Sequence, residues 1–215
     1  MRDTLRALPV LTNADKVPFN PDDTPDSPFT LFVDWLKTAI DAGEPEPHVM
    51  TVSTVAEDMS ADCRALILKD VDEKGWYFAV SSKSPKGKHI EKNPNIALTF
   101  YWQGFARQVR IKGRAVAMPD KINEIDFLSR TEQARALASL GMQSEPLSNE
   151  QELIDKWQSQ LESIKQQPDF VSQYWTVYCV RANSVEFWQG QSSRRHTRLR
   201  YVLEDGGFKK EKLWP

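Results

Sequence analysis

The sequence predicts a mainly β domain with peripheral helices, in the α+β class. Residues 49–117 contain a succession of short segments rich in β-branched and aromatic residues, which are typical of strands. Residues 28–42 and 148–166 instead repeat apolar side chains at helical spacing, which predicts two amphipathic helices. Because a chain of 215 residues can form one large domain, we expect a single domain over residues 28–215 behind an extended leader, residues 1–27.

The leader and the first helix have opposite compositions. Residues 13–27 are rich in Asp, Pro and Asn, which disfavour both helix interiors and strand ladders. The helix over residues 28–42 has Asp26 or Ser27 as its N-cap and Gly43 as its stop. Its apolar residues recur on one side, so we expect it to dock on a sheet.

The remaining elements are predicted from changes in the spacing of apolar residues along the chain. Expected strands cover residues 49–55, 65–68, 76–80, 96–102, 107–117, 175–180, 184–188, 199–203 and 208–213. Hairpin connections at residues 70–75 and 204–207 favour sequential antiparallel pairing. Residues 119–138 are helical with an expected break near Ser129, and a capping-box-like sequence at Ser148 begins the last helix.

Composition and charge argue against several classes of protein. A net charge of -2 and a pI near 6.0 provide no global basic field, so nucleic acid is not an expected partner. The two cysteines, Cys63 and Cys179, support neither a disulfide scaffold nor a zinc site, so we expect no metal and a reducing, cytoplasmic location. No window approaches the roughly eighteen apolar residues of a spanning helix, so no membrane association is expected.

Residues 186–201 form the most informative stretch of the chain. Four arginines fall there together with Trp188 and His196. Guanidinium groups suit phosphate or carboxylate held by two parallel hydrogen bonds, so the stretch predicts an anionic ligand beside an aromatic surface. A solvated basic turn is the structural alternative.

Cations also recur at the ends of expected strands. Arg64 precedes and Lys69 follows one apolar strand, residues 81–88 place hydroxyls and lysines after another, and Gln108 opens a third. Hydroxyls beside lysines favour phosphate, although residues 81–88 would also fit a solvated turn. The sequence lacks the motifs of dinucleotide folds, Walker ATPases, zinc proteases and α/β-hydrolases.

These motifs occur in the order found in a known family. They are RALILK at 64–69, SPKG at 84–87, NP at 93–94, RQVR at 107–110, QS at 143–144 and FWQG at 187–190, followed by Arg194, His196 and Arg198 at alternate positions. With them, residues 28–215 resemble the pyridoxine/pyridoxamine 5'-phosphate oxidases. The resemblance implies an FMN-binding split β-barrel, homodimeric, with FMN in clefts that both chains line.

The resemblance also implies which residues contact the flavin. They are Arg64, Lys69, Ser84, Lys86, Gln108, Gln143, Ser144, Trp188 and Arg198. Of these, Arg64, Ser84 and Lys86 would serve the ribityl phosphate, which requires several convergent donors. A donor or cation near the pyrimidine ring would favour the reduced flavin.

The implied reaction oxidises pyridoxamine or pyridoxine 5'-phosphate to pyridoxal 5'-phosphate, with O2 as acceptor and peroxide as product. Lys69 and Arg130 match the family's contacts to the substrate phosphate. Arg194 and His196 match the groups over the substrate ring, where they would orient the substrate and assist loss of a proton.

Several positions depart from the family pattern. A tyrosine and a serine at the substrate phosphate become Asp126 and Ala134, and a carboxylate beside a phosphate is unfavourable. At the flavin, residues 79–80 are Ala-Val where the family has a tyrosine-threonine pair. Pro85 replaces an arginine of the family, so Lys83 or Lys88 would have to supply the missing positive charge. We therefore expect weaker binding of the phosphorylated substrate.

Two alternatives remain open at this stage. One is an FMN-dependent oxidase of another planar reduced substrate, such as a dihydrophenazine, as in the related flavin oxidases of phenazine biosynthesis. The other is a flavin-binding protein with little turnover.

Overall fold

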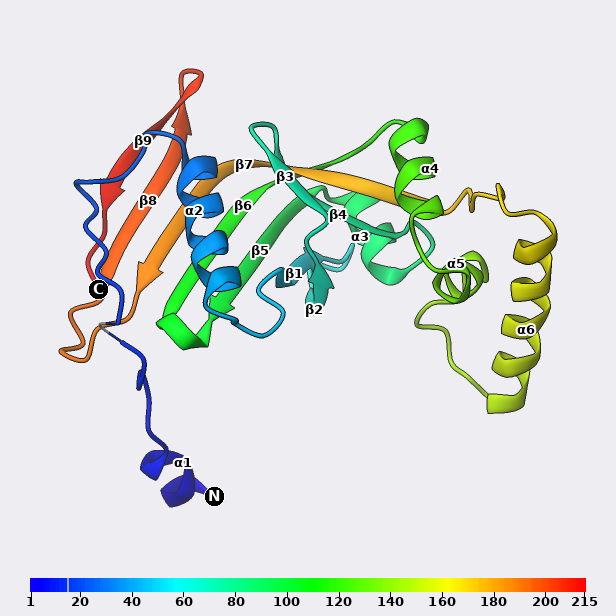
Figure 1. Ribbon diagram of the computed structural model, residues 1–215, viewed down its shortest axis with the longest axis horizontal. Coiled ribbons are helices and arrows are strands. Elements are labelled where there is room, and N and C mark those ends of the chain that lie inside the picture. The colour runs from blue at the N-terminus through cyan, green and yellow to red at the C-terminus, as the bar shows by residue number, and fades with distance from the viewer. Residues whose placement is uncertain (15) are drawn as a thin grey trace.

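The computed structural model describes residues 1–14 and 16–215, which form one curled antiparallel sheet with peripheral helices (Figure 1). The helices are α1 (Arg2–Ala7), α2 (Pro28–Asp41), α3 (Pro85–Lys92), the short 3₁₀ turn η1 (Gln103–Phe105), α4 (Asp120–Leu128), α5 (Glu132–Ser139) and α6 (Glu150–Gln166). The strands are β1 (Val49–Val55), β2 (Ala61–Ile67), β3 (Asp70–Asp72), β4 (Gly75–Ser81), β5 (Asn95–Trp102), β6 (Arg107–Ala117), β7 (Trp175–Gln189), β8 (Thr197–Glu204) and β9 (Gly207–Lys212). The predicted mainly β, α+β class is confirmed.

The sheet branches at its longest strand, β7. Its strand order is β2-β1-β5-β6-β7-β4-β3, and the β8–β9 hairpin is attached to β7. The first half of β7 pairs with β4, the second half pairs with β8, and β6 pairs along both halves. The prediction of two separate strands over residues 175–180 and 184–188 is wrong, because a register shift opposite Lys112/Gly113 bends one continuous strand without ending it.

Helix α2 lies across one face of the sheet and covers the aromatic core (Figure 1). The hydroxyl of Ser27 caps its first turn, as the sequence predicts. The Phe32 ring centroid lies 4.9 Å from that of Phe100, and the Trp35 centroid lies 5.2 Å from that of Phe187. Because these side chains are buried, their packing fixes α2 against β5 and β7.

The leader differs from the predicted extended segment in one respect. Its first residues form α1, a helix without buried side chains, in which Asp3 at the start and Arg6 at the end complement the helix dipole. Later in the leader, Phe19 packs edge-on against Trp35 at 4.9 Å, and the Tyr201 hydroxyl donates to the carbonyl oxygen of Pro25 at 2.7 Å. The second part of the leader is therefore held against α2 and β8.

Helix α3 begins where the sequence indicates only a phosphate-type turn. Ser84 is its N-cap and Pro85 stands at its first position, a combination that favours helix initiation. Gly87 lies against the end of β4, since a Cβ there would stand 2.5 Å from the carbonyl oxygen of Ser81. This close approach brings the helix N-terminus to the end of β4.

The helices after β6 begin and end close to their predicted positions. Ser129 is the C-cap of α4 and Thr131 the N-cap of α5, which confirms the expected break. Helix α6 is capped by Asn149, whose side chain accepts from the backbone N–H of Gln151 at 2.8 Å, and Ser148 lies outside it. None of the helices in the described part of the chain is long and apolar enough to cross a membrane.

Replacing the α3 cap should destabilise the protein modestly. Ser84→Ala removes the acceptor of the Gly87 N–H and the donor to Ser81, so we expect unfolding free energy to fall by about 1 kcal/mol. Urea denaturation followed by circular dichroism measures this, with the adjacent Ser82→Ala as the control. An unchanged midpoint in Ser84→Ala would show that this cap does not stabilise the helix.

Candidate active site

A cleft with a volume of about 650 Å³ lies at the end of the sheet next to α5 and α6. Strands β2 and β4, the first residue of β7 and the start of α3 contribute to it from the sheet side. Helices α5 and α6, the connection between them and Arg130 before α5 contribute from the helical side. Among the predicted site residues, Lys69, Lys86, Arg130 and Gln143 line the cleft. Most other lining side chains are apolar, so the cleft suits a flat apolar ligand that carries anionic groups.

Lys86 provides a buried positive charge at the start of α3. The residue is only 6% exposed, and no carboxylate in the described part of the chain lies within ion-pair distance of its ammonium group. Burial, and secondarily the charge of Arg64, lower the pKa of Lys86. A buried ammonium group without a counterion in a cleft is suited to an anionic ligand.

Arg64 lies in β2 near Lys86 and is held by its own neighbours. Its guanidinium donates to the Thr54 hydroxyl at 2.8 Å and to the carbonyl oxygen of Val52 at 3.1 Å, and it pairs with Asp62. The Thr54 hydroxyl also contacts the Nδ1 atom of His89 at 3.0 Å. These contacts orient Arg64 on β2 before any ligand arrives.

The hydroxyl of Ser84 is engaged within the chain. It is fully buried, donates to the Ser81 carbonyl oxygen at 2.7 Å and accepts from the Gly87 N–H. Ser84 therefore acts on the cleft through the N-terminus of α3, where unpaired backbone N–H groups attract anions, and direct contact with FMN remains a prediction.

The two lysines that would replace the charge missing at Pro85 lie in different surroundings. The Lys83 ammonium lies 3.7 Å from the centroid of the Tyr174 ring, and Lys88 is exposed beside a separate hollow lined by Glu57 and Asp58. Lys83 is therefore the nearer of the two to the cleft, since its side chain also approaches Gly141.

The substrate end of the cleft contains an ion pair that joins two of the predicted positions. The Lys69 ammonium lies 3.1 Å from a carboxylate oxygen of Asp126, whose other oxygen accepts from the Trp175 indole N–H at 2.7 Å. Ala134 lines the same part of the cleft. The carboxylate at residue 126 thus lies directly on Lys69, the cation predicted to contact the substrate phosphate.

Arg130 is the second cation at this end. Its guanidinium carbon lies over the Trp175 ring, 4.2 Å from the centroid, which is a cation–π contact. Burial lowers the pKa of Arg130, and the negative charge of Asp126 opposes that effect. Its Nε atom is buried without a hydrogen-bond partner in the described part of the chain. With Asp126 neutralising Lys69, Arg130 supplies the net positive charge of this end.

Three of the predicted flavin residues form one row across the far part of the sheet. Gln108 of β6 is opposite Trp188 of β7, which is opposite Arg198 of β8. The His196 ring packs on Trp188 with a centroid distance of 4.9 Å. The row therefore brings a hydrogen-bonding amide, an aromatic surface, an imidazole and a guanidinium to one face of the sheet.

The turn between β7 and β8 orients the two predicted catalytic residues. The Gln191 backbone N–H donates to Nδ1 of His196 at 3.2 Å, so the neutral ring carries its proton on Nε2. Arg194 has a left-handed backbone conformation with φ 65°, and its side chain is exposed. The turn thus presents a guanidinium outward beside an imidazole of fixed orientation.

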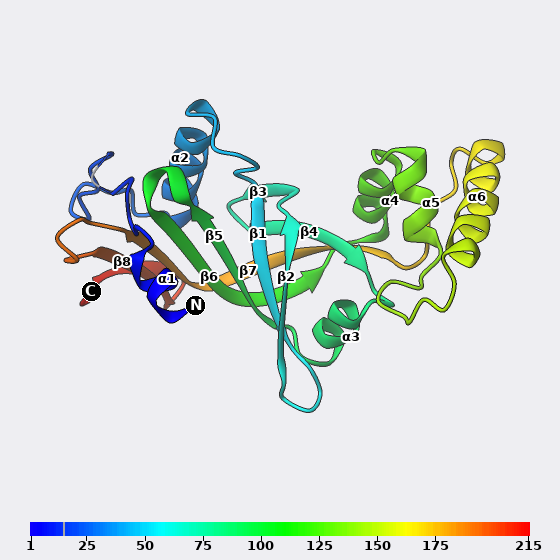
Figure 2. The same cartoon turned by 90° about the horizontal axis from the view of Figure 1, so that it is seen from below.

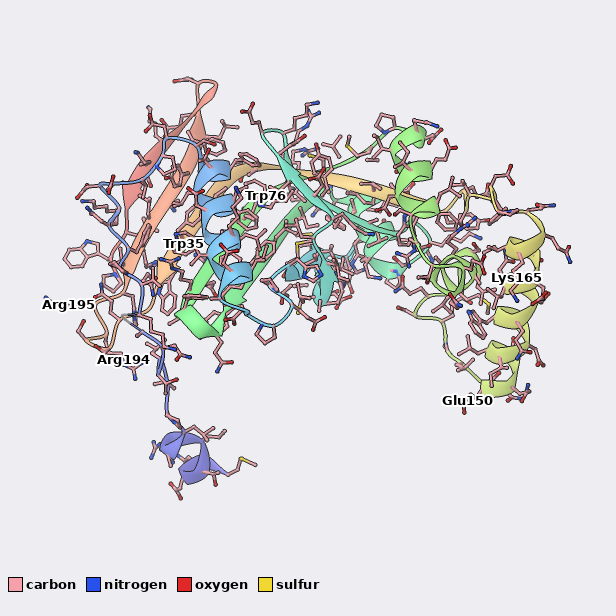
Figure 3. All side chains as sticks on the ribbon, viewed as in Figure 1. Trp35, Trp76, Glu150, Lys165, Arg194 and Arg195 are labelled. Atoms are coloured by element: carbon pink, nitrogen blue, oxygen red, sulfur yellow. The ribbon has the colours of Figure 1, made fainter. Side chains whose placement is uncertain are left out.

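The predicted residues of the cleft and those of the row with Trp188 lie at opposite ends of the molecule. Figures 1 and 2 show α4, α5 and α6 at one end of the sheet and the β8–β9 hairpin at the other. Figure 3 shows Arg194 at the hairpin end, far from Glu150 and Lys165 on α6. Gln143 and Ser144 follow α5 at the cleft end, so a single chain does not bring them to the row with Trp188.

Three residues at these sites lie outside the predicted set. Trp175 binds Asp126 and makes a cation–π contact with Arg130, Ser81 places a buried and unpartnered hydroxyl oxygen at the cleft, and Glu186 pairs with Arg198. Ser81 and Glu186 fall within stretches whose composition predicts a ligand, but neither is assigned a contact from the sequence, and Trp175 falls within a run that indicates only a strand. Contacts between different elements give Trp175 and Glu186 their neighbours, and no local pattern in the sequence marks those contacts.

The residues of the cleft fit the phosphate of FMN. Lys86 provides a buried cation, the α3 N-terminus provides backbone donors, and the unpartnered Ser81 hydroxyl oxygen lies in the same wall, while Arg64 lies behind them on β2 and is paired with Asp62. Convergent cations, hydroxyls and helix N–H groups are the donor set that a phosphate monoester requires.

The sequence matches two family models that together cover most of the chain. Residues 36–159 match the model described as "Pyridoxamine 5'-phosphate oxidase". Residues 175–215 match the "Pyridoxine 5'-phosphate oxidase C-terminal dimerisation region". The second region contains β7, β8 and β9, and with them Trp188 and Arg198 of the row described above.

Curated relatives agree with these matches. A pyridoxine/pyridoxamine 5'-phosphate oxidase of Bacteroides fragilis is 36% identical over 194 residues, which cover 90% of this chain and 83% of the relative. The enzyme of the same name from Haemophilus influenzae is 39% identical over 194 residues, which cover 88% of this chain and 90% of the relative.

Solved structures share the fold. PhzG from Burkholderia lata 383, in complex with tetrahydrophenazine-1-carboxylic acid, superposes with a TM-score of 0.87 at 26% identity and covers 94% of this chain and 100% of its own. A pyridoxamine 5'-phosphate oxidase-related, FMN-binding protein from Nostoc punctiforme has a TM-score of 0.73 at 13% identity, covering 89% and 100% of the two chains. The predicted split β-barrel is therefore confirmed, and the chain belongs to the pyridoxamine 5'-phosphate oxidase family, whose cofactor is FMN.

Proposed function

We propose that this protein is an FMN-dependent oxidase that converts pyridoxamine and pyridoxine 5'-phosphate to pyridoxal 5'-phosphate, with O2 as acceptor and peroxide as product. The observation that carries the proposal is its 36–39% identity, over about nine tenths of the chain, to relatives named for this activity. The cleft supports it, since Lys69, Arg130 and Lys86 provide cations for two phosphate groups.

The active unit is a homodimer with two shared sites. The separation of the cleft from the Trp188 row supports this, because within one copy the cations of the cleft are far from the aromatic and polar groups of the row. The match of residues 175–215 to a dimerisation region supports it further. In the dimer, the row of one copy closes the cleft of the other, and the predicted cytoplasmic location is part of the same proposal.

The residues of the cleft divide between the two ligands. Arg64, Lys86 and the α3 N-terminus hold the FMN phosphate, while Lys69 and Arg130 hold the substrate phosphate. The remaining flavin contacts come from Gln143 and Ser144 of the same copy and from Gln108, Trp188 and Arg198 of the other. Support for this division comes from the buried, unpaired charge of Lys86 and the guanidinium of Arg130 over the Trp175 ring.

Bound FMN supplies the hydride acceptor and the reaction with O2. The protein contributes orientation: Arg194 and His196 hold the substrate ring face-on, next to the aromatic surface of Trp188. His196 donates its Nε2–H to the substrate, because its Nδ1 atom already accepts from the Gln191 backbone N–H, so it orients the substrate ring.

A second candidate is the oxidation of a larger planar substrate such as a dihydrophenazine. The contact between Asp126 and Lys69 favours it, because it weakens the cationic site for a phosphate. The apolar cleft and the 26% identity to PhzG agree with this candidate. A flavin-binding protein with little turnover is the third.

Peroxide formation distinguishes the candidates. FMN-loaded protein is mixed with pyridoxamine or pyridoxine 5'-phosphate, and pyridoxal 5'-phosphate is followed by its absorbance alongside peroxide. Turnover at micromolar substrate is the expected result. Oxygen uptake only with a tetrahydrophenazine carboxylate would establish the second candidate, and yellow protein that photoreduces without turning over any of these substrates would establish the third.

A further inference from the structure

A buried carboxylate lies between two arginines at the row that contains Trp188. The Glu186 side chain is 8% exposed and forms ion pairs with Arg198 and Arg110. Charged groups are rarely buried unless they are paired, so the position of this carboxylate depends on its two partners.

Glu186 fixes one edge of the Arg198 guanidinium. A single carboxylate oxygen of Glu186 accepts from both Nε and Nη2 of Arg198, at 3.0 and 2.9 Å. The Nη1 atom donates to the carbonyl oxygen of Trp214 at 2.9 Å. Arginine has five N–H donors, and three of them are used here, which leaves two N–H groups for a ligand.

The sheet register makes this arrangement specific. Glu186 lies two residues before Trp188 on β7, so both side chains point to the same face. On the opposite face, Phe187 and Leu199 are buried in the core and hold β7 and β8 in register. The carboxylate therefore reaches Arg198 diagonally across two strands that cannot slip relative to each other.

We propose that Glu186 is a positioning residue for the flavin site: it holds Arg198 in the orientation that binds FMN and moderates its positive charge. The inference rests on the proposed contact between Arg198 and FMN. Reduction of the flavin adds negative charge, which a nearby guanidinium stabilises. A carboxylate on the same guanidinium reduces that stabilisation, so Glu186 lowers the flavin midpoint potential while it increases affinity.

Two substitutions of Glu186 separate its two effects. Glu186→Ala removes both the acceptor and the charge, so FMN should leave the loaded protein about tenfold faster. Glu186→Gln retains an oxygen acceptor and removes the charge, so FMN release should change by less than about threefold while the midpoint potential becomes more positive. Release is measured by the gain in flavin fluorescence after dilution, and the potential by equilibration with a reference dye.

A neighbouring ion pair on the same face provides the matched control. Glu211 accepts from Nη2 and Nε of Arg200 at 2.6 and 3.0 Å, with both side chains 41% exposed. Glu211→Gln should leave both FMN release and the midpoint potential unchanged. If Glu211→Gln shifted the midpoint potential as much as Glu186→Gln does, the effect could not be assigned to Glu186.

The double variant tests whether Glu186 acts through Arg198. Arg198→Ala alone should accelerate FMN release, and adding Glu186→Ala should accelerate it by no more than about twofold further. A full additional effect would mean that Glu186 acts by another route and would overturn the inference.

The outcome for Arg198→Ala separates the two proposals. Unchanged FMN release in Arg198→Ala would contradict the proposed Arg198 contact with FMN, and the positioning role would fail with it. Faster release in Arg198→Ala combined with normal release in Glu186→Ala would reject the positioning role alone and leave the proposed function intact.

Discussion

Lys86→Met should lower the affinity for FMN by about a hundredfold. Lys86 is the buried ammonium group of the cleft and has no carboxylate partner among residues 1–14 and 16–215. Methionine preserves the unbranched apolar stem but lacks the ammonium group and its charge-assisted contact to the phosphate, so the substitution tests the contribution of that group. Titration of the apoprotein with FMN, followed by flavin fluorescence, measures the change.

Lys88→Met is the matched control for this prediction. Lys88 lies on the same helix but is exposed beside a different hollow, so its substitution should leave FMN affinity within about twofold. Equal losses of FMN affinity in the two variants would indicate that any positive charge on this helix favours binding, and would contradict a specific role for Lys86.

The same site should make FMN binding sensitive to alkaline pH. Burial, followed by the charge of Arg64, lowers the pKa of Lys86 from the ordinary lysine value of 10.5. The protonated amine is the form that binds phosphate. FMN affinity should therefore be maximal at pH values below this lowered pKa and should fall as the pH rises through it. The decline should be absent in Lys86→Met, and a decline that persists there would assign the titration to another group.

Asp126→Asn should lower the KM for pyridoxamine 5'-phosphate by about tenfold with little change in kcat. The carboxylate of Asp126 lies 3.1 Å from the Lys69 ammonium and would compete for it with the substrate phosphate under the proposed function. Asparagine retains an acceptor for the Trp175 indole N–H and removes the negative charge. Adding Ala134→Ser should lower KM further, because it introduces a hydroxyl where the family has one.

Dephosphorylated pyridoxamine is the control substrate for these variants. Its KM should not improve in Asp126→Asn, since it lacks the group that competes for Lys69. Glu124→Gln, which removes an exposed carboxylate of α4 paired with Lys121, should not change the KM for either substrate. An unchanged KM for the phosphorylated substrate in Asp126→Asn would show that Asp126 does not oppose its binding.

The sequence predicted most elements of the fold because their signals are local. The cap at Ser27 and the apolar periodicity after it defined α2, and the break near Ser129 separated α4 from α5. The prediction failed for β7, where residues near Asn183 read as an interruption. A bulge interrupts a strand pattern without ending the ladder, and only the pairing with β6 distinguishes a bulge from a turn.

The candidate site was predictable to the extent that its motifs resemble those of a known family. The order of the motifs indicated the cations of the cleft and the row with Trp188 before any contact was known. The contacts of Trp175 and Glu186 were not predictable, because the partner of Trp175 is distant in sequence and the partner of Glu186 lies on the neighbouring strand.

The sequence by itself determined the mainly β class, the helices with strong caps and the family, since these depend on local propensity and on the order of motifs. The tertiary structure decided which charges are available to a ligand. It pairs Lys69 with Asp126 and Arg198 with Glu186, leaves Lys86 buried without a carboxylate partner among the described residues, and puts the cleft and the row with Trp188 at opposite ends of the molecule. The physical reason is that the strength of a charge depends on its burial and on the partners that folding brings within a few ångströms.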